Sequence, residues 1–124
     1  MKLSEQVSNR EQSIKLESLG VKYGDANFYW GRNVERIFST EDKETHKEIN
    51  LWHDSDYVPA FTVAELGVMI PAEYFLPSNK DGAWWMSHGM TFEKTEAEAR
   101  ATMLIQLLQA NKVTPEAINQ RLTH

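Results

Sequence analysis

The sequence predicts a single small α+β domain, with an antiparallel sheet of about three or four strands packed against an N-terminal helix, a short central helix and a long C-terminal helix. Two observations lead to this prediction. Helix-start signals occur in three separate places, and β-prone aromatic stretches lie between them. The chain of 124 residues also has the usual size of one domain, and it contains no linker or internal repeat.

The first helix is expected at residues 9–19. Ser8 followed by Glu11 fits a capping box, in which the hydroxyl accepts a backbone N–H of the first turn and the carboxylate reaches back. The helix is expected to stop at Gly20, because glycine readily takes the left-handed conformation that closes a helix. Val21 is then expected to pack back on the last turn.

The central helix is predicted at residues 63–70, within the stretch PAFTVAELGVMIP. Thr62 and Glu65 form a second capping box at its start. Pro71 ends the segment, because a proline disfavours helical geometry in the residue before it.

The long C-terminal helix is predicted at residues 96–110, with Thr95 and Glu98 as a third capping box. Its apolar residues recur at helical spacing: Ala97, Ala101, Leu104, Ile105 and Leu108. A last short helix is expected to open at Pro115, since proline is favoured at the first helical position.

Strands are expected between these helices, where aromatic and β-branched residues gather. The predicted strands cover residues 26–32, 34–39, 49–53, 57–60 and 83–93. The polar stretch TEDKETHKE at residues 40–48 is expected to be a solvated loop or a hairpin tip, and LPSNKDG at residues 76–82 is expected to form a turn.

The stretch GAWWMSHGM at residues 82–90 contains two adjacent tryptophans. Successive side chains of a strand face opposite ways, so one of Trp84 and Trp85 is expected to face the core and the other to face solvent or a partner. The pair Tyr29 and Trp30 presents the same choice. Two interpretations stay open: the outer aromatics cap the sheet, or they form a binding surface together with nearby polar groups. The candidate binding residues are Tyr29, Trp30, Trp84, Trp85, His88 and Arg100.

Composition excludes several classes of function. The chain has no cysteine, which removes disulfides, thiolate nucleophiles and cysteine-based metal sites. The net charge is −5 and no cluster of lysines and arginines occurs, so nucleic-acid binding is disfavoured. No apolar stretch is as long as the hydrophobic segment of a signal peptide or of a membrane span, and we therefore expect a cytoplasmic protein.

Residues that could carry catalysis are also sparse. His46 and His53, followed by two aspartates, could gather around a divalent ion, but their spacing matches no metal motif and we expect no metal. Ser87 and His88 are adjacent and would face opposite sides of a strand, so they cannot pair simply. No phosphate-binding or dinucleotide-binding motif is present. We expect no cofactor and no catalytic residue, and the sequence favours a non-enzymatic protein over an enzyme such as a weak hydrolase.

Three segments, in this order, resemble a family of small uncharacterised proteins encoded in phages, prophages and mobile elements of bacteria. They are VSNREQSIKLESLGVK (7–22) followed by FYW (28–30), PAFTVAELGVMIP (59–71) and TEAEARATMLIQLL (95–108). The resemblance covers about half of the chain, and it implies a mobile-element origin. It implies no activity, substrate or catalytic residue.

The leading hypothesis is a non-enzymatic accessory protein that binds an unknown host or phage protein. The first alternative is a small-molecule or nucleotide-binding domain, in which Trp and Tyr side chains form a concave pocket and His88 or Arg100 converges on it. The second alternative is a homo-oligomeric structural protein, for example a homodimer whose aromatic face pairs with its copy across a two-fold axis.

Overall fold

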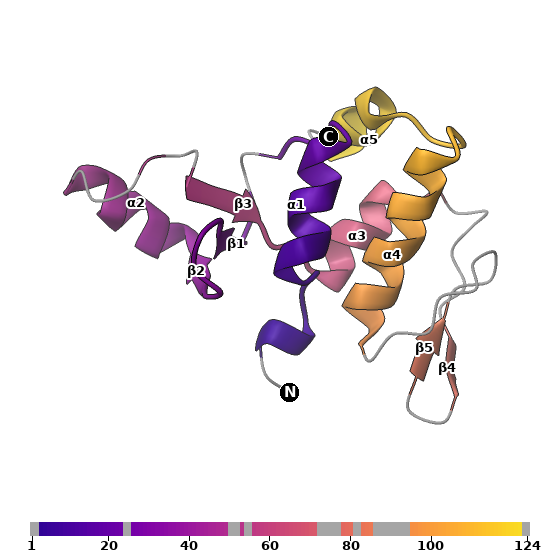
Figure 1. Cartoon of the computed structure of the whole chain (residues 1–124), viewed down its shortest axis with the longest axis horizontal. Helices are drawn as coiled ribbons and strands as arrows, with labels where there is room; N and C mark the ends of the chain where they lie inside the picture. Colours follow the sequence, from indigo (N-terminus) through magenta and orange to yellow (C-terminus); the bar gives the residue numbers. More distant parts are fainter. Residues whose placement is uncertain are drawn as a thin grey trace.

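The computed structural model confirms a small α+β domain and describes residues 3–23, 26–49, 53, 56–71, 78–80, 83–85 and 95–122; for residues 47, 78–80 and 83–85 it describes the backbone alone (Figure 1). The helical elements are η1 (Leu3–Glu5), α1 (Arg10–Ser18), α2 (Thr40–Glu48), α3 (Val63–Met69), α4 (Glu96–Gln109) and α5 (Pro115–Leu122). The strands are β1 (Phe28–Gly31), β2 (Ile37–Ser39), β3 (Tyr57–Pro59), β4 (Ser78–Lys80) and β5 (Ala83–Trp85).

A three-stranded antiparallel sheet is formed in the order β2-β1-β3. In its central strand, Tyr29 lies opposite Phe38 of β2 and opposite Pro59 of β3. Pro59 is tolerated because β3 is an edge strand, where one missing backbone donor costs no ladder bond. β4 and β5 pair with each other in a separate two-stranded ribbon.

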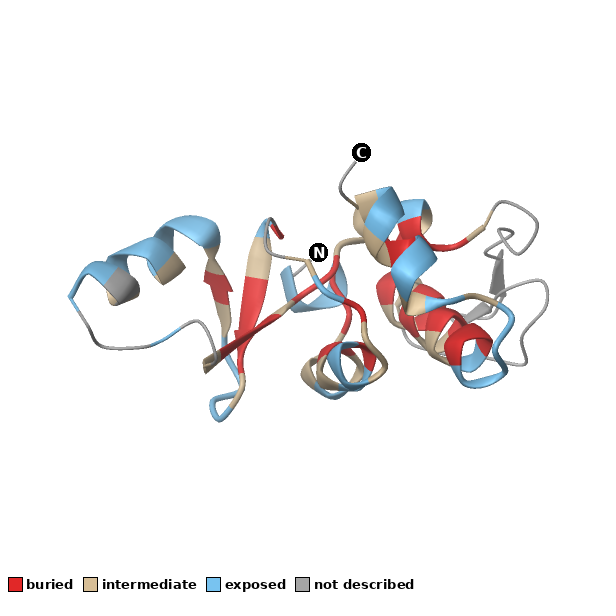
Figure 2. Ribbon diagram, turned by 90° about the horizontal axis from the view of Figure 1, so that it is seen from above, coloured by how far each residue is buried: buried red, intermediate tan, exposed pale blue. Residues whose placement is uncertain are grey.

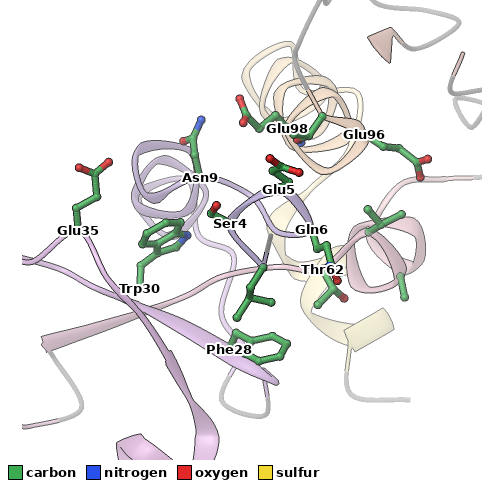
Figure 3. Close-up of a pocket in the computed structure, with 14 residues that line it drawn as sticks. Ser4, Glu5, Gln6, Asn9, Phe28, Trp30, Glu35, Thr62, Glu96 and Glu98 are labelled. Atoms are coloured by element: carbon green, nitrogen blue, oxygen red, sulfur yellow. The ribbon is translucent and has the colours of Figure 1, made fainter. Parts of the chain in front are cut away.

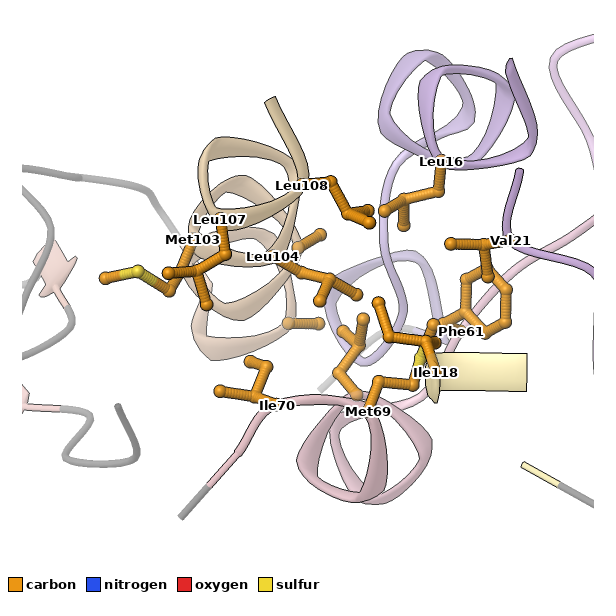
Figure 4. Packing of buried hydrophobic residues seen from close by; sticks show 13 residues of the cluster. Leu16, Val21, Phe61, Met69, Ile70, Met103, Leu104, Leu107, Leu108 and Ile118 are labelled. Atoms are coloured by element: carbon orange, nitrogen blue, oxygen red, sulfur yellow. The ribbon is translucent and has the colours of Figure 1, made fainter. Parts of the chain in front are cut away.

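The helices pack mainly on one another, and α1, α3, α4 and α5 share one hydrophobic core, called here the helical core (Figure 4). Its members are Leu16, Val21, Phe61, Leu66, Met69, Ile70, Ala97, Ala101, Met103, Leu104, Leu107, Leu108 and Ile118. The sheet has two smaller clusters, one on each of its faces. The Trp30 cluster consists of Val7, Trp30, Val58 and Ala60, and the Tyr29 cluster consists of Ala26, Tyr29, Phe38 and Tyr57.

Helix α1 links these regions, because Leu16 enters the helical core while Ile14 packs against the Trp30 cluster. The predicted helix is confirmed, but the predicted capping residues are wrong. Asn9 caps α1 and forms a capping box with Gln12, in which Asn9 Oδ1 accepts the Gln12 N–H at 2.8 Å. Ser8 is fully buried one residue earlier, where its hydroxyl bonds to groups outside the first turn.

The C-terminal end of α1 closes as predicted. Gly20 has a φ of +100°, which favours glycine, and its N–H donates to the carbonyl of Glu17 at 3.0 Å. The Val21 N–H donates to the carbonyl of Leu16 at 3.1 Å, and both side chains enter the helical core. These two bonds and the apolar contact are the Schellman arrangement of a helix end.

The other predicted helix starts are also present. At α3, the Thr62 hydroxyl accepts the Glu65 N–H at 3.2 Å and the Glu65 carboxylate accepts the Thr62 N–H at 2.9 Å, which completes the capping box. At α4, the Thr95 hydroxyl accepts the Glu98 N–H at 3.1 Å, which is one half of the box that the sequence predicts. α5 begins at Pro115, as expected.

Two segments differ from the sequence prediction. Residues 40–48 form helix α2 instead of a loop. Reciprocal bonds between Ser39 and Asp42, at 3.1 and 3.3 Å, cap its start, so the local signal was a capping motif rather than a hydrophobic stripe. Within the predicted turn at 76–82, residues 78–80 form strand β4, because they pair with β5. The remaining parts of the predicted strands at 49–53 and 83–93 lie largely outside the described residues.

Candidate functional site

The structure buries both aromatic residues of the Tyr29–Trp30 pair, one on each face of β1. The expectation that one of them faces solvent is therefore wrong. Tyr29 is 3% exposed in its cluster, and Trp30 is 7% exposed in the other. The reason is that both faces of the sheet are covered, by α1 and the Val7 segment on the Trp30 side and by α2 on the Tyr29 side.

The Trp30 indole is held by a bond to the backbone as well as by packing. Its Nε1 donates to the carbonyl oxygen of Ser8 at 2.7 Å. The Ser8 hydroxyl in turn accepts the Phe61 N–H at 3.0 Å and lies 2.8 Å from the Ser13 hydroxyl. This buried polar network therefore joins β1, the start of α1 and the approach to α3 around one tryptophan.

Among the other candidate residues outside β1, Arg100 is the one whose side chain the structure describes. Trp84 and Trp85 lie in strand β5, whose side chains are outside the description, and His88 is outside the described residues. Arg100 is buried on α4, and its Nη2 lies 2.8 Å from the carboxylate of Glu96. Arg100 thus makes one of its polar contacts with a residue of its own helix and needs no ligand for that contact.

A pocket of about 780 Å³ opens where η1, β1 and the starts of α1, α3 and α4 meet (Figure 3). The lining residues are Leu3, Ser4, Glu5, Gln6, Asn9, Phe28, Trp30, Glu35, Thr62, Val63, Ala64, Thr95, Glu96 and Glu98. The apolar residues of the lining are Leu3, Phe28, Trp30, Val63 and Ala64. The volume lies within the range of sites that enclose a small ligand or an anchoring side chain.

The pocket is lined by four carboxylates, Glu5, Glu35, Glu96 and Glu98. Its described lining contains no lysine, arginine or histidine. Glu96 is neutralised in part by Arg100 from behind. The pocket therefore combines an apolar interior with a negative rim, and it suits a cationic group on an apolar body better than an anion.

Three helix starts shape this pocket, since the capping residues Asn9, Thr62 and Thr95 all line it. Negative charge is favourable in the first turn of a helix, which is a structural reason for the positions of Glu96 and Glu98. The Gln12 amide nitrogen fixes two of the walls relative to each other, because it donates to the Glu98 carbonyl at 2.9 Å and to the Thr102 hydroxyl at 2.8 Å.

The polar groups that the described lining offers are carboxylates, hydroxyls and side-chain amides. The hydroxyls of Thr62 and Thr95 already accept backbone N–H groups of their own helices. Histidine, cysteine and lysine, which usually act as bases or activated nucleophiles, are missing from the described lining. No group of three or more histidine, aspartate or glutamate side chains that could hold a metal ion occurs in the described part of the chain.

The sequence patterns identified several residues that line the pocket, but they did not predict that a pocket forms. The capping motifs correctly place Thr62 and Thr95 at helix starts, but nothing in their spacing shows that the starts of α1, α3 and α4 converge. Phe28 and Glu5 were not among the candidate binding residues. Among the described helices, none is long and apolar enough to cross a membrane. Comparisons with protein-family models, with curated proteins and with solved structures give no significant match for this chain.

Proposed function

We propose that the chain is a non-enzymatic accessory protein of the phage or prophage type, which acts in the bacterial cytoplasm by binding a host or phage protein. The pocket is the proposed contact point. It would receive a basic side chain flanked by apolar residues from the partner. The observation that carries the proposal is the combination of an apolar interior with Phe28 and Trp30 and a rim of four glutamates.

The negative charge of the pocket rim favours some of the possible ligands over others. A nucleotide would bring phosphates toward four carboxylates, so the negative rim argues against the nucleotide-binding alternative. A partner's arginine or lysine would instead be attracted to the rim, and its apolar neighbours would be desolvated against Phe28 and Trp30. The fixed geometry between α1 and α4 also lowers the ordering cost of binding.

The homo-oligomer alternative has less support. The large apolar residues exposed in the described part of the chain are Leu3, Val34, Ile49 and Val68, and they belong to four different segments. A stable homodimer interface needs a contiguous apolar surface. Size-exclusion chromatography with light scattering at several protein concentrations would detect such a dimer directly.

The proposal is tested with two short blocked peptides, one with the sequence Arg-Leu-Arg and one with Glu-Leu-Glu, titrated into the isotopically labelled protein. We expect the basic peptide to shift the indole N–H signal of Trp30 and the ring signals of Phe28, and its affinity to fall with added salt. Each of the substitutions Glu5→Gln and Glu98→Gln should weaken binding up to about fivefold, the value that corresponds to about 1 kcal/mol for an exposed ion pair.

Glu116→Gln is the matched control, because Glu116 is exposed on α5 and lies outside the pocket lining. This variant should bind the basic peptide like the wild type. Equal shifts with the acidic peptide, or equal losses from Glu116→Gln and Glu98→Gln, would contradict a basic partner at this pocket.

A further inference from the structure

Helix α2 is attached to the rest of the molecule without an apolar side chain of its own. Its sequence is TEDKETHKE, and most of its described side chains are exposed (Figure 2). The attachment uses Lys43, His46 and the hydroxyl of Thr40, which donates to the carbonyl of Ala26 at 2.9 Å. Figure 1 shows the helix at the end of the molecule, away from the helical core.

The surface beneath α2 consists of three aromatic rings. Tyr29 and Tyr57 meet edge to face with ring centroids 6.2 Å apart, and Phe38 meets Tyr57 edge to face at 5.6 Å. All three rings are almost fully buried under the helix. This cluster of three rings, Tyr29, Phe38 and Tyr57, is called the aromatic cage here; Tyr29 and Tyr57 face Lys43, and Phe38 faces Arg36.

The occupant of this cage is a side chain of the protein itself. The ammonium nitrogen of Lys43 lies 4.2 Å from the ring centroid of Tyr29 and 5.9 Å from that of Tyr57. Both distances are within the range at which the negative face of an aromatic ring attracts a cation. Aromatic cages of this kind are a common means of recognising alkylammonium groups.

The charges around the cage fit a cation as well. Burial, together with the nearby carboxylates of Asp56 and Asp42, raises the pKa of the Tyr57 hydroxyl, so these two carboxylates lie close enough to favour positive charge in the cage. The other groups on the cage are His46, whose Nδ1 lies 2.5 Å from the Tyr57 hydroxyl, and Arg36, whose guanidinium lies 5.1 Å from the Phe38 ring centroid.

We propose that the aromatic cage is a binding site for a lysine side chain, free or methylated, of a partner protein, and that Lys43 is a built-in competitor that closes it. A lysine presented from a helix is the occupant that the geometry already accommodates. The Lys43 side chain is only partly buried, so it can move out into solvent while α2 continues to cover the three rings. This inference rests on the contacts of α2 and is independent of the pocket between α1, α3 and α4.

The test uses a blocked trimethyllysine as the probe, because a quaternary ammonium is less strongly hydrated than a free one, and a blocked norleucine as its uncharged counterpart. Binding is followed by NMR at the ring protons of Tyr29, Phe38 and Tyr57. In Lys43→Gln the built-in competitor is gone, and we expect the trimethyllysine probe to bind about tenfold more tightly than to the wild type, a change within the range of a cation–aromatic contact. Norleucine should cause no saturable shift.

Lys15→Gln is the control variant, because Lys15 is exposed on α1 and is remote from the cage, and it should behave like the wild type. Lys43→Met, which keeps most of the aliphatic stem, replaces Lys43→Gln if circular dichroism shows that the latter has lost its fold. The proposal is overturned if both Lys43 variants bind no more tightly than the wild type, if norleucine binds as well as trimethyllysine, or if the shifts lie outside the three rings.

Discussion

Ser8 is a small, fully buried residue whose carbonyl holds Trp30, one of the residues that line the pocket. Its sequence context suggested a helix cap, but the structure uses it to join three segments that are distant in sequence. The Ser8 hydroxyl accepts the Phe61 N–H and is hydrogen-bonded to the Ser13 hydroxyl, and the Ser8 carbonyl accepts the indole N–H of Trp30. Because all these groups are withdrawn from water, each bond that is lost leaves an uncompensated polar group in the interior.

Ser8→Ala is therefore expected to lower the free energy of unfolding by about 1–3 kcal/mol, the cost of leaving a buried N–H and a buried hydroxyl with one partner fewer. Urea denaturation at neutral pH measures this loss. Ser18→Ala is the control, because Ser18 is exposed and its hydroxyl donates only to the carbonyl of Lys15. A Ser8 variant as stable as the Ser18 variant would show that the network contributes nothing.

Tyr57 makes the stability of the protein depend on pH in the alkaline range. Burial of its hydroxyl, followed by the charges of Asp56 and Asp42, raises the pKa of Tyr57 above the ordinary value of 10.0. The unfolded chain releases this proton at lower pH than the folded protein does. The stabilisation is thus fully present below about pH 10 and is lost as the pH rises through the pKa of the folded state.

Tyr57→Phe removes both this titration and the hydrogen bond to His46. At neutral pH the variant should be less stable than the wild type by about 1 kcal/mol. The difference should shrink as the pH rises above about 10, because only the wild type loses stability through Tyr57 there. Parallel urea titrations across this range provide the measurement, and a difference that stays constant with pH would argue against the raised pKa.

At the scale of elements, the end of α1 and the start of α5 depend on each other. Gly20 closes α1 with a positive φ, and its Cα faces the ring of Pro115. Asn119 of α5 binds the same loop twice, since its Oδ1 accepts the Lys22 N–H at 2.8 Å and its Nδ2 donates to the Gly20 carbonyl at 3.0 Å. The loop after α1 is therefore a docking point for the last helix.

Gly20→Ala should destabilise the protein for two separable reasons. The φ of +100° is strained for alanine, and the added Cβ would lie 2.9 Å from the Cβ of Pro115. We expect a loss of roughly 1–3 kcal/mol in the free energy of unfolding. A double-mutant cycle with Pro115→Gly, which removes the contacted Cβ, separates the two effects: the steric part should be recovered in the double variant and the backbone part should remain. Full additivity would mean that the contact with Pro115 is harmless.

Helix α2, like strand β4, was not predicted from the sequence patterns, and for α2 the failure has a physical cause. The search for helices relied on apolar residues at helical spacing, and residues 40–48 contain none. The capping pair Ser39 and Asp42 was a valid local signal that the absence of apolar residues outweighed. Exceptions to local rules tend to occur at functional sites, which agrees with the role proposed for the cage under this helix.

At the scale of the whole molecule, the fold class and the three capped helices could be predicted because each depends on local sequence. The helix starts at Thr62 and Thr95 and the helix end at Gly20 are set by residues within a few positions of each other. The division into a helical core and two sheet clusters could not be predicted, because it depends on which faces meet after the chain has folded.

The same distinction between local and long-range contacts applies to the candidate pocket. Trp30 was selected for its residue type, and it does line the pocket, but its partners there come from η1, α3 and α4. Arg100 was considered as an anion ligand, whereas the structure pairs it with Glu96. Residue type thus identified a group with binding potential, and only the convergence of distant helix starts determined the charge of its surroundings.

The position of η1 has a practical consequence for every binding experiment on this protein. Residues 3–6 line the pocket, and Figure 1 shows the N-terminus and α5 on opposite sides of the molecule. A purification tag fused before Leu3 would emerge at the pocket mouth and would compete with any ligand there, particularly a polyhistidine tag at acidic pH. A tag placed after α5 leaves the mouth open, and a fluorophore attached before Leu3 would report directly on its occupancy.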